Sequence, residues 1–190
     1  MRKTTVIVAV TAFALGGLVG AYALLRERPV EHGVAAGAVR PAWSEVQWPF
    51  PMDQWGKGKA FRCKPSDCGA EVVVYVRAKI GFCNCTTGIS DDEELDRISD
   101  YDLIGNKLAA LGPGRPIAVA WMKGRSRAFT IGGAQPAGKS ALSVGFNDRC
   151  DAIVATAVLG HEQPSAIEPA VLEFLNSKTV VRWAEVTLGL

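Results

Sequence analysis

The stretch Glu71-Val-Val-Val-Tyr-Val-Arg-Ala-Lys79 is the clearest strand in the sequence, and the fold class follows from it and its neighbours. β-Branched and aromatic residues fill its centre, and these residue types favour extended structure. A helix is expected soon afterwards, because Ser90-Asp-Asp-Glu93 combines a hydroxyl N-cap with a glutamate three residues later. Leu95 and Ile98 continue this helix at the spacing of a buried face. The chain therefore combines strands with helices.

Beyond this helix the apolar pattern changes its period. A second helical segment is expected between Leu103 and Leu111, ending at Gly112-Pro113-Gly114. Apolar residues then alternate with polar ones in short runs that Gly, Pro, Asn and Asp separate, which is typical of an antiparallel meander. The four expected strands are Ile117–Met122, Arg127–Ile131, Ala141–Phe146 and Ala152–Val158.

The C-terminal residues complete the predicted domain. Ser165–Asn176 carries apolar residues on one helical side, whereas Thr179–Leu188 alternates well enough to form a last strand. We therefore expect an α+β domain with a mainly antiparallel sheet of five to six strands and two or three helices.

The N-terminal residues indicate export. Arg2 and Lys3 precede an apolar run from Val6 to Leu25, and no charged residue follows until Arg26. A helix of this length is about 30 Å long, which is enough to span a bilayer. Ala21-Tyr22-Ala23, in contrast, has the small-x-small form that a signal peptidase cuts. We favour an uncleaved signal-anchor helix over a cleaved signal peptide.

Three segments are predicted: 1–25 as the signal-anchor or signal peptide, 26–54 as a Pro-containing tether, and 55–190 as one exported domain. The predicted location is the bacterial inner membrane with a periplasmic domain, or the periplasm if cleavage follows Ala23. Aromatic side chains around the end of the tether are expected to cap the core of the domain. They are Trp43, Trp48, Phe50, Trp55 and Phe61.

The cysteines form the strongest local pattern. Two pairs flank the strand at 71–79, and a fifth cysteine follows much later. In an oxidising compartment structural disulfides are the preferred interpretation, and bonds between the two pairs are favoured over a strained Cys83–Cys85 ring. Cys150 is either a buried free thiol or a replacement partner in a bridge. The disulfide candidates are Cys63, Cys68, Cys83, Cys85 and Cys150.

Two other uses of the thiols remain open. Cys63, Cys68, Cys83 and Cys85 are candidate ligands for zinc, although their spacing departs from the usual two-residue interval. The Cys83-Asn-Cys85 pair is suited to copper(I) or to disulfide exchange. No cofactor is assigned.

Three further patterns are interpreted without a function. Gly133–Ser140 has the spacing of a phosphate-binding loop, but the residues after it alternate like a strand, so no nucleotide is expected. The acidic run from Asp91 to Asp102 lacks the glycine and final glutamate of a calcium loop and is interpreted as a solvated helix face. Cys150 and His161 act as nucleophile and base only if they meet in space, so no catalytic residue is assigned.

Composition narrows the function classes. The chain has 190 residues, 48% hydrophobic and 21% charged, with a formal charge of +2, so it is a folded protein without the basic surplus of a nucleic-acid binder. We predict a non-enzymatic, disulfide-stabilised exported domain, attached to the membrane by its N-terminal helix. It would bind another envelope component, such as an envelope protein, or assist its assembly. A metal or thiol-redox factor is the alternative, and a hydrolase ranks third.

Overall fold

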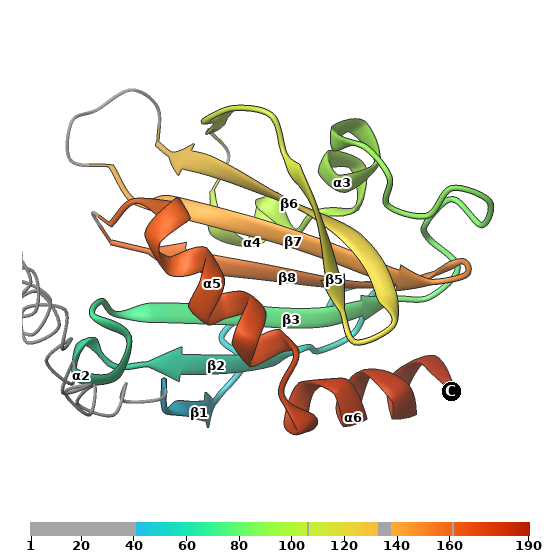
Figure 1. Ribbon diagram of the computed structural model, residues 1–190, viewed down its shortest axis with the longest axis horizontal. Helices are drawn as coiled ribbons and strands as arrows, with labels where there is room; N and C mark the ends of the chain where they lie inside the picture. The colour runs from blue at the N-terminus through green and yellow to red at the C-terminus, as the bar shows by residue number, and fades with distance from the viewer. Residues whose placement is uncertain (1–40, 106, 133–137, 161) are drawn as a thin grey trace, which may run out of the picture. The chain divides into compact units, whose positions relative to one another are not determined.

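The computed structural model describes residues 41–190 except 106, 133–137 and 161, and these lie within one compact unit. They form an eight-stranded, antiparallel open sheet and five helices, which confirms the α+β class with more strands and helices than expected (Figure 1). The elements are β1 (Trp43–Val46), β2 (Lys59–Cys63), α2 (Pro65–Cys68), β3 (Val72–Lys79), α3 (Asp92–Ile98), α4 (Tyr101–Ile104), β4 (Leu108–Ala110), β5 (Arg115–Val119), β6 (Met122–Ile131), β7 (Ser140–Asp148), β8 (Asp151–Leu159), α5 (Pro164–Leu175) and α6 (Lys178–Leu188).

The strand order is β1-β2-β3-β8-β7-β6-β4, with β5 also paired to β6. Strands β5 to β8 pair in sequence order, each antiparallel to the next, so the predicted meander of four strands is confirmed. The first predicted strand, Ile117–Met122, is wrong in its bounds, because it crosses the turn between β5 and β6. The predicted strand at 71–79 is β3. It pairs with β8 over its whole length, from Val72↔Leu159 to Lys79↔Ala152, and so joins the N-terminal strands to the meander.

One face of the sheet packs against α5 and α6, and we call it the α5 face. Val72, Val74 and Val76 of β3 point to this face and are fully buried. They share one hydrophobic cluster with Val171 of α5 and Ala184 of α6. Alternate residues of a strand point to the same side, so the valine-rich centre of β3 supplies one wall of the main core.

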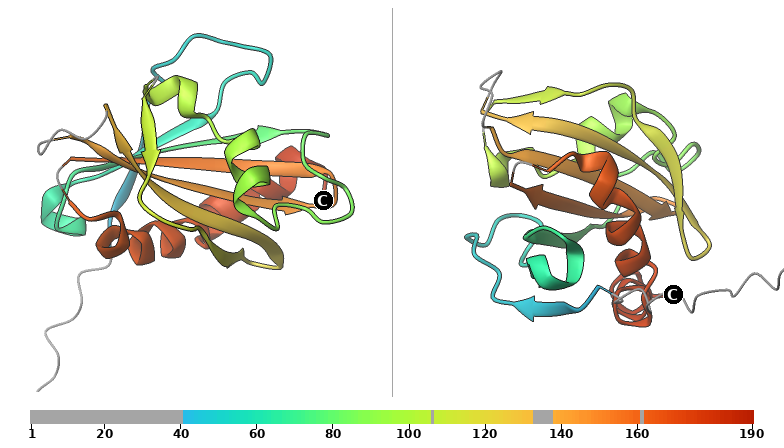
Figure 2. Two further views of the ribbon diagram at one scale, coloured as in Figure 1. Left: turned by 90° about the horizontal axis from the view of Figure 1, so that it is seen from above. Right: turned by 60° about the vertical axis from the view of Figure 1, so that its left-hand side comes forward.

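The opposite face carries α3 and α4, and we call it the α3 face. Leu95 and Ile98 of α3 are fully buried against Ala152 and Val154 of β8, as the spacing of the first two predicted. The segment between β1 and β2 also covers this side, so the sheet is sandwiched between two layers of chain (Figure 2). The five aromatic residues expected to cap the core are divided between both faces, because Trp43 stacks on Phe174 while Trp48 and Phe50 contact Tyr75.

The prediction of a last strand at Thr179–Leu188 is wrong, because these residues lie in helix α6. The Ser177 side chain accepts a hydrogen bond from the Val180 backbone N–H and caps the helix. Val180, Ala184 and Leu188 are buried at helical spacing, while Val186 is 70% exposed. Apolar residues here fit both periods, and the N-cap decides for the helix.

The second helical segment, expected from Leu103 to Leu111, is also mostly wrong. Helix α4 ends at Ile104, and Gly105 follows it with its N–H bonded to the Tyr101 carbonyl. Residues 108–110 form β4, which pairs with the end of β6. Leu111 is 53% exposed, so the leucine spacing did not mark a buried helical face.

Two differences concern the expected starts of elements. Strand β1 lies within 26–54, the segment predicted as a tether, and pairs with β2 from Trp43↔Cys63 to Val46↔Ala60. The N-cap of α3 is Asp91, not Ser90, since the Asp91 carboxylate accepts a hydrogen bond from the Glu94 backbone N–H.

The predicted anchor at 1–25 lies outside the described residues. Within the part of the chain that the structure describes, no helix is long and apolar enough to cross a membrane.

Candidate functional site

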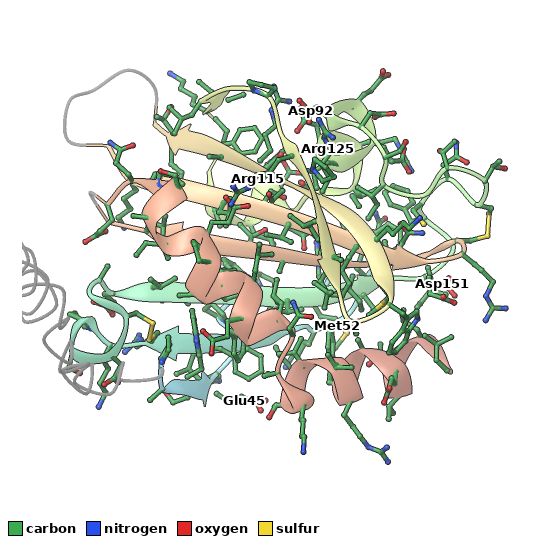
Figure 3. The ribbon with its side chains drawn as sticks, viewed as in Figure 1. Glu45, Met52, Asp92, Arg115, Arg125 and Asp151 are labelled. Carbon is green, nitrogen blue, oxygen red and sulfur yellow. A yellow bond between two sulfur atoms is a disulfide. The ribbon has the colours of Figure 1, made fainter. Side chains whose placement is uncertain are left out.

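Four of the five cysteines form two disulfides, Cys63–Cys68 and Cys85–Cys150. The first closes a short loop around α2, so the expectation of bonds between the two sequence pairs is wrong. Cys150 replaces Cys83 as the partner of Cys85, one of the two outcomes that the sequence left open. Figure 3 shows the two sulfur–sulfur bonds at opposite ends of the sheet.

This arrangement does not assemble the proposed zinc ligands. Cys63 faces the first residue of β3 across the sheet, whereas Cys83 and Cys85 follow the last residue of that strand. The strand separates the two groups by about 23 Å at the usual rise per residue. Among the described residues, no group of His, Cys, Asp and Glu side chains has the geometry of a metal site.

Cys83 is the one free cysteine, and it is buried. Its thiol donates to the Arg149 carbonyl at 3.2 Å, and its backbone N–H donates to the Cys150 carbonyl at 3.1 Å. Burial raises the pKa of this thiol to about 11, and the nearby carboxylates of Glu94 and Asp151 add to the rise. The thiolate is the reactive form of cysteine, so this environment keeps Cys83 unreactive towards the neighbouring disulfide at neutral pH.

A buried ionic cluster lies on the α3 face at the end of β3. Arg77 donates two hydrogen bonds to Asp100 and one to Asp53, each 2.6 Å long, and Lys79 pairs with Asp100 at 2.8 Å. The Arg77 hydrogen bond holds the pKa of Asp53 below its usual value. The Lys79 ammonium also lies 5.4 Å from the ring centre of Trp55. Two positive and two negative groups balance here, so this cluster fastens the segment before β2 to the sheet.

The acidic residues of α3 form only in part the solvated face that the sequence suggested, because Glu93 is exposed whereas Asp92 and Asp96 pair with arginines of the sheet. Asp92 accepts from the Gly114 backbone N–H and pairs with Arg125 of β6, and both interactions lower the pKa of Asp92 (Figure 3). Asp96 pairs with Arg127 at 2.6 Å. These arginines come from alternate positions of one strand, so the acids bind α3 to the sheet.

Away from these paired charges, the α3 face contains a cavity of about 340 Å³, which we call the Tyr75 pocket. Strands β3 and β8 form its floor, and the chain just before β7 and just after β8 forms its rim. Burial raises the pKa of Tyr75 above its usual value. The lining residues are Glu71, Val73, Tyr75, Lys139, Val158, Leu159, Gly160 and Glu162.

One polar atom at the rim of this pocket is buried without a hydrogen-bond partner. It is Oε2 of Glu162, one of four such side-chain atoms among the described residues. Two of the others, Nε1 of Trp48 and Oγ1 of Thr156, belong to neighbours of Tyr75 that do not line the pocket. Native proteins satisfy most buried polar atoms with protein groups, water or a ligand, so the Glu162 oxygen is the group of this pocket that a bound molecule would satisfy.

Local structure fixes Glu162 at the rim. The Ser140 hydroxyl donates to the Glu162 carbonyl at 3.0 Å, which ties the chain after β8 to the start of β7. The Glu162 carboxylate folds back over Gly160, where an added Cβ would come within 3.1 Å of Oε2. Gly160 therefore leaves the space that this carboxylate occupies.

A second, smaller cavity of about 130 Å³ lies between β1 and α5. Trp43 has the fourth unpartnered atom, Nε1, and stacks on Phe174 at 4.5 Å. The walls of this smaller cavity are mainly apolar, and the cavity has fewer polar groups to orient a ligand than the Tyr75 pocket. The lining residues are Pro41, Trp43, Ala170, Glu173, Phe174 and Ser177.

The other predicted patterns have these outcomes. Gly133–Ser140 connects β6 to β7, and Ser140 begins a strand where a phosphate-binding loop requires a helix; residues 133–137 lie outside the described part. Cys150 is bonded to Cys85, so its thiol is not available as a nucleophile. His161 lies outside the described residues.

No sequence pattern predicted the Tyr75 pocket, although one of its lining residues, Lys139, lies in the Gly133–Ser140 segment with the spacing of a phosphate-binding loop. The one pattern that could have predicted the pocket was the meander. Antiparallel neighbours bring the start of β7 and the end of β8 to the same end of the sheet. No protein-family model matches this chain, and no significant match to a curated protein was found.

Proposed function

We propose that this protein is an exported, non-catalytic binding domain that holds a small ligand or chain end from the cell envelope in the Tyr75 pocket. The observation that carries the proposal is the buried, unpartnered carboxylate oxygen of Glu162 at the rim of that pocket. Its volume falls within the range of small-molecule sites, and its apolar floor with a few convergent polar groups is their usual composition.

Export is the second part of the proposal, and the N-terminal sequence supports it. An apolar run behind Arg2 and Lys3 favours a membrane anchor or a signal peptide, and two disulfides are typical of an oxidising compartment. A reporter active only in the cytoplasm, fused after Leu190, should therefore be silent. A bright cytoplasmic signal would contradict this part.

The same geometry disfavours the two cysteine-based alternatives. A metal centre needs the thiols together, but the two groups lie at opposite ends of β3. A redox factor needs an accessible thiol with a lowered pKa, whereas Cys83 is buried with a raised one. The disulfides are better suited to stability than to exchange.

Binding in the Tyr75 pocket is testable by mass spectrometry under non-denaturing conditions. The full chain is purified from a bacterial envelope, with Val158→Trp to fill the pocket and Val186→Trp as a matched control on the exposed side of α6. We expect a bound small molecule on the wild type and on Val186→Trp, and none on Val158→Trp. A bound species that Val158→Trp retains, or none on any form, would contradict the proposal. Equal melting temperatures of the two variants establish that both are folded.

A further inference from the structure

Two opposite charges in the Tyr75 pocket have no ion-pair partner among the described residues: Lys139 and Glu162. The buried charges of the α3 face are paired, as in Arg77–Asp100 and Lys79–Asp100. Glu162, with a buried and unpartnered oxygen, differs from them in this respect.

Lys139 and Glu162 line the same cavity without forming an ion pair with each other. Oε2 of Glu162 is buried and unpartnered, and a carboxylate only accepts hydrogen bonds. The Lys139 side chain is exposed, and its ammonium only donates. A ligand that binds both groups brings a donor to the Glu162 side of the pocket and an acceptor to the Lys139 side.

The remaining walls set the size and polarity of the middle of such a ligand. Val73, Val158 and Leu159 are apolar, and the ring of Tyr75 adds a flat surface. The third charged lining residue, Glu71, is exposed and pairs with Arg62. With about 340 Å³ available, the space suits an amino acid or a short peptide better than a lipid or a polymer bound along its length.

We propose that the Tyr75 pocket binds a small zwitterion, with its ammonium group at Glu162 and its carboxylate at Lys139. This inference rests on the proposed function and specifies the ligand class of the same site. A free amino acid and the two ends of a short peptide share this chemistry, so both are tested.

Calorimetric titration of the full chain with defined probes tests the ligand class. The probes are L-alanine and L-alanyl-L-alanine, each compared with its N-acetyl form and its C-terminal amide. We expect one zwitterion to bind at least tenfold more tightly than either blocked form, since each block removes one charge-assisted contact. Tighter binding of the amino acid or of the dipeptide distinguishes the two sources.

Charge-removing variants assign each end of the ligand. Glu162→Gln should remove the preference for a free amine and keep that for a free carboxylate, and Lys139→Met should do the reverse. Glu93→Gln and Lys123→Met change exposed residues outside the pocket and should bind as the wild type does. Equal binding of blocked and unblocked probes, or loss of both preferences in each variant, would overturn the inference.

Failure here is distinguishable from failure of the proposed function. If the envelope-derived molecule binds but no zwitterion competes with it, the ligand class is wrong and the binding site stands. If Val158→Trp leaves all binding unchanged, the site itself is wrong.

Discussion

Individual buried groups on the α3 face show how this chain tolerates charge and thiol in its interior. Arg77, Lys79 and Asp100 are each at most 5% exposed, and they satisfy one another. Cys83 is kept as a neutral thiol beside carboxylates. In the first case opposite charges pair with one another, and in the second burial favours the protonated thiol.

Breaking the ionic cluster should be costly. Arg77→Met leaves the buried Asp100 with Lys79 as its one charged partner, and such a loss typically destabilises a protein by about 3–5 kcal/mol. Lys59→Met breaks the exposed pair with Glu45 and should cost less than about 1 kcal/mol. Urea unfolding of both variants measures the difference. Similar small losses in the two would show that the cluster does not hold the sheet and its covering segment together.

The Cys83 thiol predicts a pH dependence of stability. Its folded pKa is about 11 against 9.0 for an unperturbed cysteine thiol, so above pH 9 the unfolded chain releases this proton before the folded one. Stability should therefore fall as the pH rises from 9 to 11, by a total of about 2–3 kcal/mol. The measurement is the unfolding free energy of wild type minus that of Cys83→Ala across this range. Parallel curves for the two proteins would argue against a buried neutral thiol.

At the scale of elements, sequence patterns identified the strands better than the short helices. The valine run of β3 and the four-strand meander were predictable, because apolar and polar residues that alternate over several positions fit only the period of a strand. Leu103–Leu111 and Thr179–Leu188 were not, since their apolar spacing fits two periods. In each case one residue at a helix end decides the structure. Gly105 ends α4 with its N–H bonded to the Tyr101 carbonyl, and the Ser177 side chain begins α6 by accepting the Val180 N–H.

The helical state of α6 is testable at its cap. Ser177→Ala removes the hydroxyl that accepts the Val180 N–H and should cost about 1 kcal/mol, whereas Ser177→Gly should cost only a few tenths. A residue in or next to a strand would show the opposite order, because glycine weakens extended structure more than alanine. Thermal unfolding of the two variants decides between these orders.

On the scale of the whole molecule, two disulfides close loops of very different size. Cys85–Cys150 joins residues 65 apart, and Cys63–Cys68 residues five apart. Sequence alone indicated disulfides but not their pairing, because pairing depends on which strand ends lie together. The Tyr75 pocket escaped prediction for the same reason, since Glu162 and Lys139 come to line one pocket only through the pairing of β7 with β8.

Loop size predicts the order in which the two disulfides matter. By the loop-entropy relation, Cys85→Ser with Cys150→Ser should lose about 4 kcal/mol, and Cys63→Ser with Cys68→Ser about 2 kcal/mol. Both partners are replaced so that no thiol is left to pair with Cys83. Guanidinium unfolding of the two double variants gives the comparison, and a larger loss for the short loop would contradict it.

The central claim is that a ligand completes the Tyr75 pocket, and the electron density of the protein as isolated from an envelope tests it most directly. We expect a crystal structure at high resolution to show an organic molecule in this pocket, within hydrogen-bond distance of Oε2 of Glu162. A pocket closed by protein side chains, with that oxygen bonded to a group of the chain itself, would contradict the account.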